Sequence, residues 1–378
     1  MPNILVLAHE PYLNGASHSL LTLLNGLKRE MQFLVIVPAQ GEMINALQES
    51  GIQSRVLKLP RCAMKASGWF GTMKSRLLLI KNKANHLHRL KQVLGDFKPD
   101  LIYTNTSVQD LGFDLSVLLN IPHVWHIREY GDKDFGYQYL PSKTSVRKKM
   151  NHSNAVLFTT QDLLRHWHLS SKNQAVIYNG VVSHHIPFRN PASMPNPVRM
   201  SIVGLIMPTK GQLDALIILR ALLDKQVNVQ LQIFGKINDS SYEQTLRNFV
   251  NERRLQNHVV WKGYVEQDEL YAQTDILLSC AQSEGFGRTL VEAMGRGIPV
   301  VARHQGGPAE IIQDMQTGYL YDEIREATEK IQMCILQDQS RLGCITSARE
   351  YARTHFSIEN YLEKVSATML NIIYGRNH

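Results

Sequence analysis

The chain has 378 residues, 44% of them hydrophobic and 20% charged, with a formal net charge of +8. This length favours two domains over one, and the composition is sufficient for ordinary globular cores. No apolar run reaches the ~18 residues that a membrane-spanning helix requires, and the first ten residues lack the charged region and cleavage site of a signal peptide. The four cysteines form no C-x-x-C pair, which disfavours a zinc site or redox dithiol and fits a reducing cytoplasm.

The positive charge is concentrated in the first half of the chain. Residues 1–180 hold 21 Lys and Arg against 12 Asp and Glu, whereas the remaining residues hold 20 against 21. The excess is densest at 61–98, where basic residues interleave with Met, Trp, Phe and Leu. Such a stretch is typical of a helix on an anionic membrane surface, and the alternative is a solvated helix face. Nucleic-acid binding is disfavoured, because the sequence contains no recognition module.

Short apolar runs alternate with helical patterns through the first half. Helical periodicity is clear at 17–30, between the first two apolar runs. Alternation of strands and helices predicts a parallel sheet. The predicted strands of this half are 3–8, 32–38, 100–105, 123–127 and 155–160.

The second half repeats this pattern. Between the halves, residues 183–197 are rich in Pro, Asn and Ser, which is typical of a linker. We therefore expect an α/β protein with two Rossmann-like domains, 1–182 and 198–356, that face each other across a cleft. The predicted strands of the second half are 199–204, 229–235, 258–263, 274–280 and 298–302.

Two carboxylates, Glu284 and Glu292, stand eight residues apart around the sequence Gly-Phe-Gly. The apolar run before them predicts a buried strand, and residues 288–294 have helical composition, so 283–287 is a loop at the carboxyl end of a parallel strand. Open α/β sheets bind ligands there, and the N–H groups of the following helix favour an anion. Carboxylates beside an anion site repel the anion, so we expect them to accept hydrogen bonds from hydroxyl groups. The alternative is that the acids merely complement the helix dipole.

Other phosphate-binding patterns are absent. The segment "GFGRTL" has Leu290 where the third glycine of a dinucleotide fingerprint would stand, and "GLIMPTKGQ" at 204–212 is no Walker A loop. A dehydrogenase and a P-loop ATPase are therefore disfavoured.

The order of motifs along nearly the whole chain resembles glycosyltransferase family 4, whose members are retaining enzymes with the GT-B fold. The late E-x7-E pattern of 284–292 is its most specific part. The other matching segments are "NGASHSLLTLLNGL" (14–27), "IPHVWHIREY" (121–130), "VIYNGV" (176–181), "VGLIMPTKGQLDAL" (203–216) and "VVWKGYVEQDELYAQTDILLSC" (259–280).

The resemblance implies roles for residues of the second domain. Glu284 is similar to the carboxylate that binds hydroxyls of the donor sugar, and Glu292 to the carboxylate that binds the ribose. Lys210 resembles the cation that meets the diphosphate and stabilises the leaving group. The remaining residues of the implied donor site are Gly285, Phe286 and Gly287, which offer backbone N–H groups, and Lys262, Gly263 and Tyr264, which line the base pocket.

The resemblance also implies roles for residues of the first domain. Gly15, in the turn before the first helix, would offer an N–H to the phosphate; the alternative is that it is a simple turn glycine. His126 resembles a histidine near the reacting sugar, with Arg128 pointing the same way; a lone histidine at a strand end is more often structural. The amphipathic segment 357–378 is expected to pack back on the first domain, as in that fold.

The sequence departs from the family pattern at Leu205, where an arginine usually accompanies the lysine on the diphosphate. Three arrangements stay open: Lys210 acts alone with helix dipoles, Arg288 or Arg303 substitutes, or the phosphate is bound differently. Asn14 and Ser17 also replace a family glycine and glutamate.

The resemblance implies transfer of a sugar from a UDP-, GDP- or ADP-sugar to an acceptor hydroxyl, with the anomeric configuration retained and no metal cofactor. The basic segment favours a glycan or lipid-linked glycan acceptor, as in bacterial surface polysaccharide synthesis, and a position on the inner face of the cytoplasmic membrane. The alternatives are a sugar-nucleotide epimerase on a similar fold and a non-catalytic module that binds sugar nucleotides or membranes.

Overall fold

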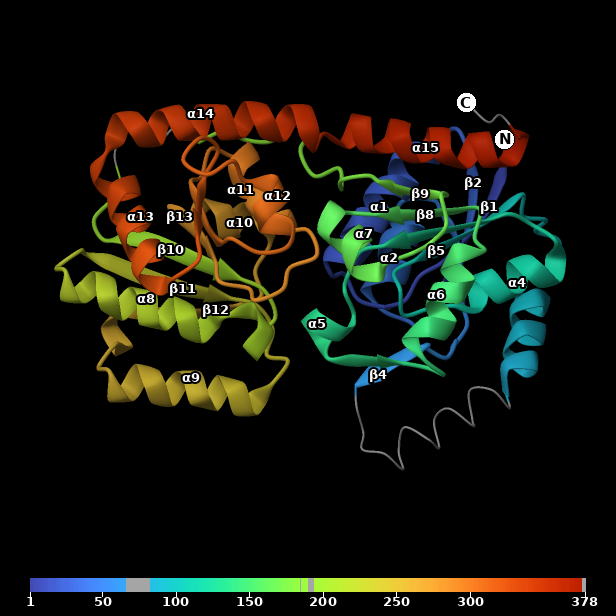
Figure 1. The fold of residues 1–378 in the computed structure, drawn as a ribbon, viewed down its shortest axis with the longest axis horizontal. Coiled ribbons are helices and arrows are strands. Elements are labelled where there is room, and N and C mark those ends of the chain that lie inside the picture. The colour runs from blue at the N-terminus through green and yellow to red at the C-terminus, as the bar shows by residue number, and fades with distance from the viewer. Residues whose placement is uncertain (66–81, 184, 190–193, 376–378) are drawn as a thin grey trace. The chain divides into compact units, whose positions relative to one another are not determined.

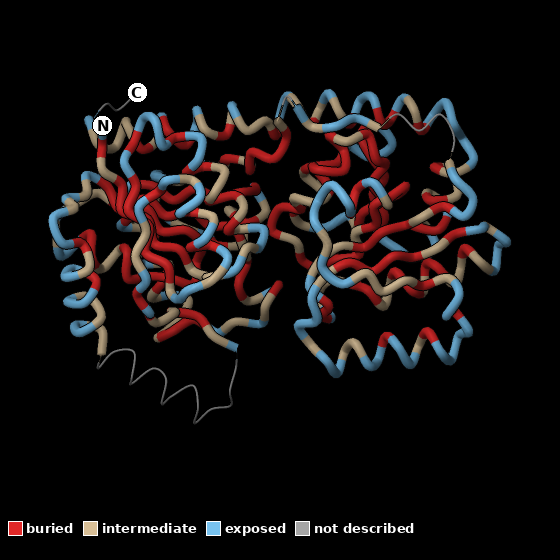
Figure 2. The backbone as a smooth tube through the Cα atoms, turned by 180° about the vertical axis from the view of Figure 1, so that it is seen from behind, coloured by how far each residue is buried: buried red, intermediate tan, exposed pale blue. Residues whose placement is uncertain are grey.

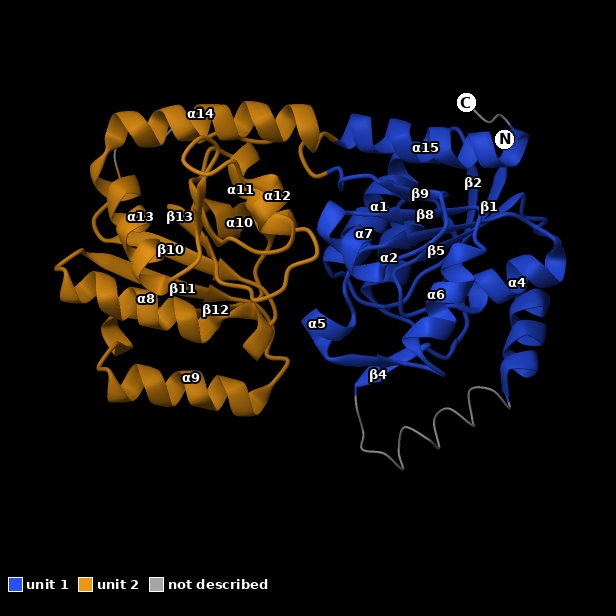
Figure 3. Cartoon of the chain, in the orientation of Figure 1, with its two compact units in different colours: residues 1–180, 358–378 blue, residues 181–357 orange. Residues whose placement is uncertain are grey.

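The computed structural model describes residues 1–65, 82–183, 185–189 and 194–375. The chain divides into two compact units, each an α/β structure with its own parallel sheet (Figures 1 and 3). Unit 1 comprises residues 1–180 together with 358–378, and unit 2 comprises residues 181–357. No helix among the described residues is long and apolar enough to cross a bilayer.

Unit 1 is built on a seven-stranded sheet in which every neighbouring pair is parallel. Its strands consist mainly of buried apolar residues, as expected where both faces of a parallel sheet are covered (Figure 2). In sheet order, the strands are β3 (Gln53–Val56), β2 (Gln32–Val37), β1 (Asn3–Leu7), β5 (Leu101–Asn105), β6 (His123–Ile127), β8 (Ala155–Phe158) and β9 (Gln174–Val176).

Helices cover both faces of this sheet. One face packs on α1, α2 and α15, where Tyr361, Val365 and Met369 are buried in the same core as Leu24. The other face packs on α4, α6, α7 and a helix over residues 82–94. The bounds are α1 (Gly15–Leu27), α2 (Glu42–Glu49), α4 (Leu111–Leu119), α5 (Asp132–Phe135), α6 (Lys143–Asn151), α7 (Gln161–Trp167) and α15 (Ile358–Tyr374), with a small antiparallel pair of β4 (Ala63–Lys65) and β7 (Tyr137–Tyr139).

Unit 2 repeats this plan with a six-stranded parallel sheet. In sheet order, its strands are β12 (Val259–Gly263), β11 (Val229–Phe234), β10 (Val198–Val203), β13 (Ile276–Ser279), β14 (Val300–Arg303) and β15 (Tyr319–Tyr321). The helices are η1 (Pro208–Lys210), α8 (Gln212–Asp224), α9 (Ser240–Glu252), η2 (Gln256–His258), α10 (Gln267–Ala272), α11 (Arg288–Gly295), α12 (Gly307–Ile311), α13 (Ile324–Leu336) and α14 (Asp338–His355).

In each sheet the strand order reverses direction at one point. In unit 1 the reversal lies between β1 and β5, and in unit 2 it lies between β10 and β13. The loops that leave two such strands diverge to opposite sides of the sheet and open a crevice at their carboxyl ends, where α/β proteins bind ligands. The topology therefore gives each unit one preferred position for a site.

All ten predicted strands are present, with ends that differ by one or two residues. The helix predicted at 17–30 is α1, which begins earlier because the Asn14 side chain accepts a hydrogen bond from the N–H of Ser17 and caps it. The predicted basic segment at 61–98 lies partly outside the described residues, which omit 66–81.

Candidate functional site

The Gly-Phe-Gly loop joins β13 to α11, as the sequence predicts. Gly287 caps α11 with φ of 98° and ψ of 52°, a left-handed conformation that favours glycine. Phe286 is only 4% exposed and packs edge-on against Phe356, with ring centroids 5.8 Å apart. The loop is therefore anchored by an aromatic side chain within unit 2, which holds the backbone on either side of Glu284 in place.

Lys210 and Glu284 meet across the reversal point of unit 2. Lys210 ends η1 after β10, Glu284 follows β13, and Nζ lies 2.6 Å from Oε2. The contact depends on Gly211, where φ is 72° and an added Cβ would lie 2.1 Å from the carbonyl oxygen of Cys280. Only glycine permits this close approach of the two loops. The structure thus brings together two predicted site residues that are 74 positions apart.

Glu292 lies on α11 and is 6% exposed. Its Oε2 accepts a hydrogen bond of 2.7 Å from the Tyr271 hydroxyl, and its Oε1 accepts bonds of 3.2 Å from Gln267 and 3.3 Å from Arg288. Burial and the adjacent Glu292 raise the pKa of Tyr271 well above its ordinary value, so this hydroxyl stays a donor. The carboxylate is oriented by three donors before any ligand arrives.

The residues considered as replacements for the missing arginine are already engaged. Leu205 is 37% exposed and lies after β10, between Gly204 and the start of the Lys210 turn. Arg288 contacts Glu292, and Arg303 forms an ion pair with Asp214. Lys210 is thus the cation that stands directly on the loop of Glu284.

The three residues predicted to line a base pocket lie at the end of β12. Gly263 has φ of 64°, and its carbonyl oxygen accepts a hydrogen bond of 2.7 Å from the N–H of Gly235. Tyr264 is 56% exposed, with the Lys236 ammonium 5.0 Å from its ring centroid. Lys262 instead donates to Gln273 at 2.6 Å. Tyr264 therefore offers an aromatic surface, whereas Lys262 is directed to a structural partner.

In unit 1, His126 is fully buried at the end of β6. Its Nδ1 lies 2.6 Å from the Tyr103 hydroxyl and 3.4 Å from the Arg128 guanidinium, while Nε2 has no hydrogen-bond partner among the described residues. Burial and the charge of Arg128 hold the pKa of His126 well below its ordinary value, so the ring is neutral. In this structure His126 presents no surface to solvent, unlike the exposed Gly15 at the start of α1.

Arg128 is also buried and is held by neutral oxygen atoms. It donates to Asn105 at 2.6 Å and to the Tyr361 hydroxyl at 2.9 Å, and it also bonds Asn179. Tyr361 belongs to α15, so this guanidinium ties the last helix to the sheet of unit 1. The sequence predicts a site role for Arg128, and the structure adds this anchoring role.

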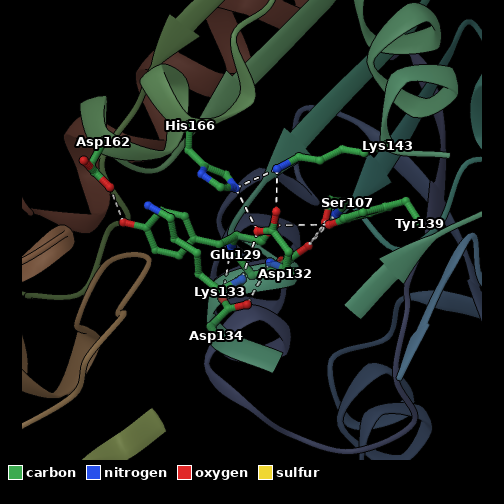
Figure 4. Close-up of polar contacts among 11 residues, drawn as sticks. Ser107, Glu129, Asp132, Lys133, Asp134, Tyr139, Lys143, Asp162 and His166 are labelled. Carbon is green, nitrogen blue, oxygen red and sulfur yellow. Dashed lines mark hydrogen bonds and ion pairs between the residues drawn. The ribbon is translucent and has the colours of Figure 1, made fainter. Parts of the chain in front are cut away.

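A further polar residue, Glu129, lies at the carboxyl ends of the strands of unit 1 and was not singled out from the sequence. Glu129 follows β6 and accepts, on Oε1, hydrogen bonds of 2.5 Å from the Ser107 N–H and 2.6 Å from the Ser107 hydroxyl. The Ser107 hydroxyl also lies 2.7 Å from the Tyr139 hydroxyl (Figure 4). Burial raises the pKa of Glu129 to about 7, although the bonds from Ser107 lower it. The sequence does contain a signal for this residue, because Glu129 is an acid two positions after the end of the predicted strand 123–127.

Among the described residues, no three His, Cys, Asp or Glu side chains gather in the way that a metal ion requires. The candidate sites in both units are instead composed of carboxylates paired with basic or hydroxyl groups. Such groups suit a ligand that carries both phosphate and hydroxyls.

Comparison with solved structures defines the fold class. The chain superposes on Anabaena HepE in complex with UDP with a TM-score of 0.80 at 21% identity, covering 98% of this chain and 100% of that one. It superposes on the lipopolysaccharide outer core galactosyltransferase WaaB with a TM-score of 0.68 at 17% identity, covering 99% of each. The predicted GT-B fold is confirmed.

Sequence comparison adds a family match in the second unit. Residues 189–351, which lie within unit 2, match the family model of glycosyl transferases group 1. The chain is 27% identical over 252 residues to poly(ribitol-phosphate) alpha-N-acetylglucosaminyltransferase of Staphylococcus aureus (strain COL), covering 64% of this chain and 49% of that protein. It is 24% identical over 309 residues to lipopolysaccharide 1,6-galactosyltransferase of Escherichia coli (strain K12), covering 74% and 79%. The chain spans less than half the length of the first curated relatives that it matches.

Proposed function

We propose that the protein is a glycosyltransferase that moves a sugar from a nucleoside-diphosphate sugar to an acceptor hydroxyl. The observation that carries the proposal is the Lys210–Glu284 pair at the reversal point of unit 2, with Nζ and Oε2 2.6 Å apart beside the Gly-Phe-Gly loop. A cation suits the diphosphate, and a carboxylate suits the hydroxyls of the sugar. The match to glycosyl transferases group 1 in the same unit supports this assignment.

In the proposed mechanism, Lys210 stabilises the negative charge that develops on the departing diphosphate. Glu284, released from Lys210 when phosphate takes its place, accepts hydrogen bonds from the donor sugar, and Glu292 accepts those of the ribose. We propose retention of configuration by attack on the same face that the phosphate leaves, with the phosphate taking the acceptor proton. The contribution of the protein is then positioning and charge stabilisation, without a divalent metal.

Relatives act on poly(ribitol-phosphate), poly(glycerol-phosphate) and lipopolysaccharide. These names support a glycan or lipid-linked glycan acceptor in the synthesis of a bacterial surface polysaccharide. We further propose peripheral contact of the basic segment 61–98 with the inner face of the cytoplasmic membrane. Neutralising Lys74, Arg76, Lys81 and Lys83 should weaken binding to anionic vesicles, and unchanged binding would remove this part of the proposal.

The proposal is tested by thermal-shift measurements with a panel of nucleoside diphosphates and their sugars, with magnesium and with EDTA. We expect selective, metal-independent stabilisation by one donor, followed by transfer to a glycan with an unchanged anomeric configuration by NMR. Turnover of the donor sugar into its epimer without an acceptor would identify an epimerase. Binding of a donor without any product would favour a non-catalytic module, for which the exposed Leu205 is the supporting observation.

A further inference from the structure

Glu129 occupies the sheet edge at which unit 1 is expected to bind a ligand. The strand order of unit 1 reverses between β1 and β5, and β6 lies directly beside β5. Ser107 follows β5 and Glu129 follows β6, so both stand past the carboxyl ends of neighbouring strands. In unit 2 the Lys210–Glu284 pair follows β10 and β13, the two strands that flank the reversal, so Glu129 lies at the same end of its sheet but one strand further from the reversal.

The two oxygen atoms of the Glu129 carboxylate are used differently. Both hydrogen bonds from Ser107 reach Oε1, whereas Oε2 has no hydrogen-bond partner among the described residues. The side chain is partly exposed. A carboxylate has room for about four hydrogen bonds, and Oε2 is not one of the fully buried, unpartnered polar atoms of the described residues, so it is open to an incoming group. The arrangement therefore holds an oriented acceptor atom ready for a donor group.

The segment after Glu129 is fixed on both sides. The N–H groups of Tyr130 and Gly131 donate to the Asp134 carboxylate at 3.0 Å and 2.7 Å. Figure 4 shows Asp132 bound to Lys143 and His166, at 2.7 Å and 2.8 Å. These bonds join the segment to α6 and α7, so the carboxylate of Glu129 is oriented in advance rather than carried on a loose loop.

The surroundings of Glu129 favour a neutral, hydroxyl-bearing ligand over an anion or a cation. The charged groups that act on it are Arg128, which follows β6 and lowers the pKa of Glu129, and Asp134 from α5, which raises it. From β7 come the hydroxyls of Tyr137 and Tyr139, and beyond them Arg61 pairs with Glu10 at 2.6 Å. Hydroxyls and a half-hidden carboxylate are groups that bind sugars and polyols through charge-assisted hydrogen bonds.

We propose that Glu129 is the residue that binds and positions the acceptor, with Oε2 accepting a hydrogen bond from a hydroxyl group of the acceptor glycan. This inference rests on the proposed transferase function and adds a binding site for the second substrate. Protonation of the carboxylate would remove the strong acceptor atom, so acceptor binding should improve as the pH rises through neutrality. The donor site in unit 2 has its own carboxylates and should be indifferent to Glu129.

The test compares Glu129→Gln with the wild-type chain, using the donor that stabilises the wild type and octyl glycosides of glucose, galactose and N-acetylglucosamine as acceptors. Gln keeps the oxygen that meets Ser107 but lacks the charge. We expect the acceptor KM to rise about ten- to hundredfold, as for loss of a hydrogen bond to a charged group. The donor KM and the slow hydrolysis of the donor by water should stay unchanged, and the pH dependence of kcat/KM for acceptor should disappear.

Two further variants distinguish a role of Glu129 in acceptor binding from a role in folding. Ser107→Ala should give a smaller rise in acceptor KM, because the backbone N–H still orients Oε1. Glu49→Gln removes an exposed acid from α2 and should behave like the wild type. If none of the glycosides is a substrate, their binding is measured by saturation-transfer NMR; equal signals for wild type and Glu129→Gln, or none for the wild type, would overturn the inference.

The outcomes also separate this inference from the proposed function. If the wild type binds no sugar nucleotide, the transferase proposal fails. If the wild type transfers sugar and Glu129→Gln has the same acceptor KM and pH profile, only the role of Glu129 fails. A parallel rise in donor and acceptor KM together with a lower melting temperature would mean a structural role and would equally overturn the inference.

Discussion

Both units carry charged groups at the carboxyl ends of their parallel strands, but the surroundings of these groups differ between the two units. At the edge of unit 2, acids lie beside bases: Lys210 with Glu284, and Arg288 with Glu292. At the edge of unit 1, His126 and Glu129 are surrounded mainly by hydroxyls, and burial shifts their pKa values toward the neutral form. The same fold thus supports a compensated polar site in one unit and a desolvated one in the other.

The difference has a chemical consequence. A compensated ion pair exchanges partners at modest cost, because an incoming anion can replace the carboxylate on the lysine. A desolvated carboxylate instead gains most from a ligand that supplies a hydroxyl without a charge. The two edges are therefore suited to two different substrates, one phosphorylated and one polyhydroxylated.

The largest expected effect is that of Lys210→Ala. Without the ammonium, the developing charge on the diphosphate loses its direct partner, and we expect kcat to fall about 10²- to 10³-fold. The matched control is Lys225→Ala, which removes an exposed lysine at the end of α8. Steady-state kinetics with a saturating donor measure the change. Activity within a few-fold of the wild type would show that another cation serves the diphosphate.

The paired carboxylates of unit 2 should separate binding from turnover. Glu292→Ala removes the acceptor held by Tyr271 and Gln267, so donor affinity should fall about tenfold or more by calorimetry. Glu284→Ala should leave the affinity for the nucleoside diphosphate nearly intact and lower kcat. If both variants changed donor affinity and kcat in the same way, Glu284 and Glu292 would not have the distinct roles proposed for them.

The burial of Glu129 should make the stability of the protein depend on pH. Its pKa is raised to about 7 in the folded state, against about 4.3 in an unfolded chain. The unfolded state therefore loses its proton first, and the wild type should lose stability relative to Glu129→Gln as the pH rises from about 4 to 7, by about 1–3 kcal/mol. The difference in unfolding free energy between the two proteins is measured by denaturant unfolding at each pH, with hydrogen exchange of unit 1 as the readout. A constant difference over this range would mean that the carboxyl is not desolvated.

Asp132 should contribute to the pH dependence of stability with the opposite sign to Glu129, and its effect should be the smallest of those predicted. Burial alone would raise its pKa, but hydrogen bonds from His166 and Lys143 hold the pKa well below its ordinary value. Its contribution is therefore present above about pH 4 and is lost as the pH falls. Because the side chain is 36% exposed, we expect Asp132→Asn to cost only about 0.2–1 kcal/mol at neutral pH. A cost that grows on acidification would contradict this assignment.

The sequence predicts the regular framework better than the site. Apolar runs such as 3–8 and 229–235 are bounded by turn signals, so the buried strands and the two Rossmann-like halves were predictable. The GT-B fold was implied by the resemblance to glycosyltransferase family 4. The short strands β3, β4, β7, β9 and β15 were missed, because three or four residues carry too little periodicity. The spacing of Glu284 and Glu292 predicted a loop and a helix start, and both are present.

What the sequence did not predict depends on contacts between distant segments. The contact of Lys210 with Glu284 requires the strand order of unit 2, and that of Arg128 with Tyr361 joins residues 233 positions apart. The importance of Glu129 arises from desolvation, which one sequence does not display. Whether His126 is exposed also depends on neighbouring strands rather than on its local pattern.

The return of α15 to unit 1 imposes an order on folding during synthesis. Tyr361, Val365 and Met369 complete a core whose other members precede residue 180. Between these two parts the ribosome makes residues 181–357, which takes roughly 10–35 s at ordinary elongation rates. We therefore expect unit 1 to wait on the ribosome with an uncovered apolar face while unit 2 folds, and to be the part of the nascent chain that chaperones bind for longest.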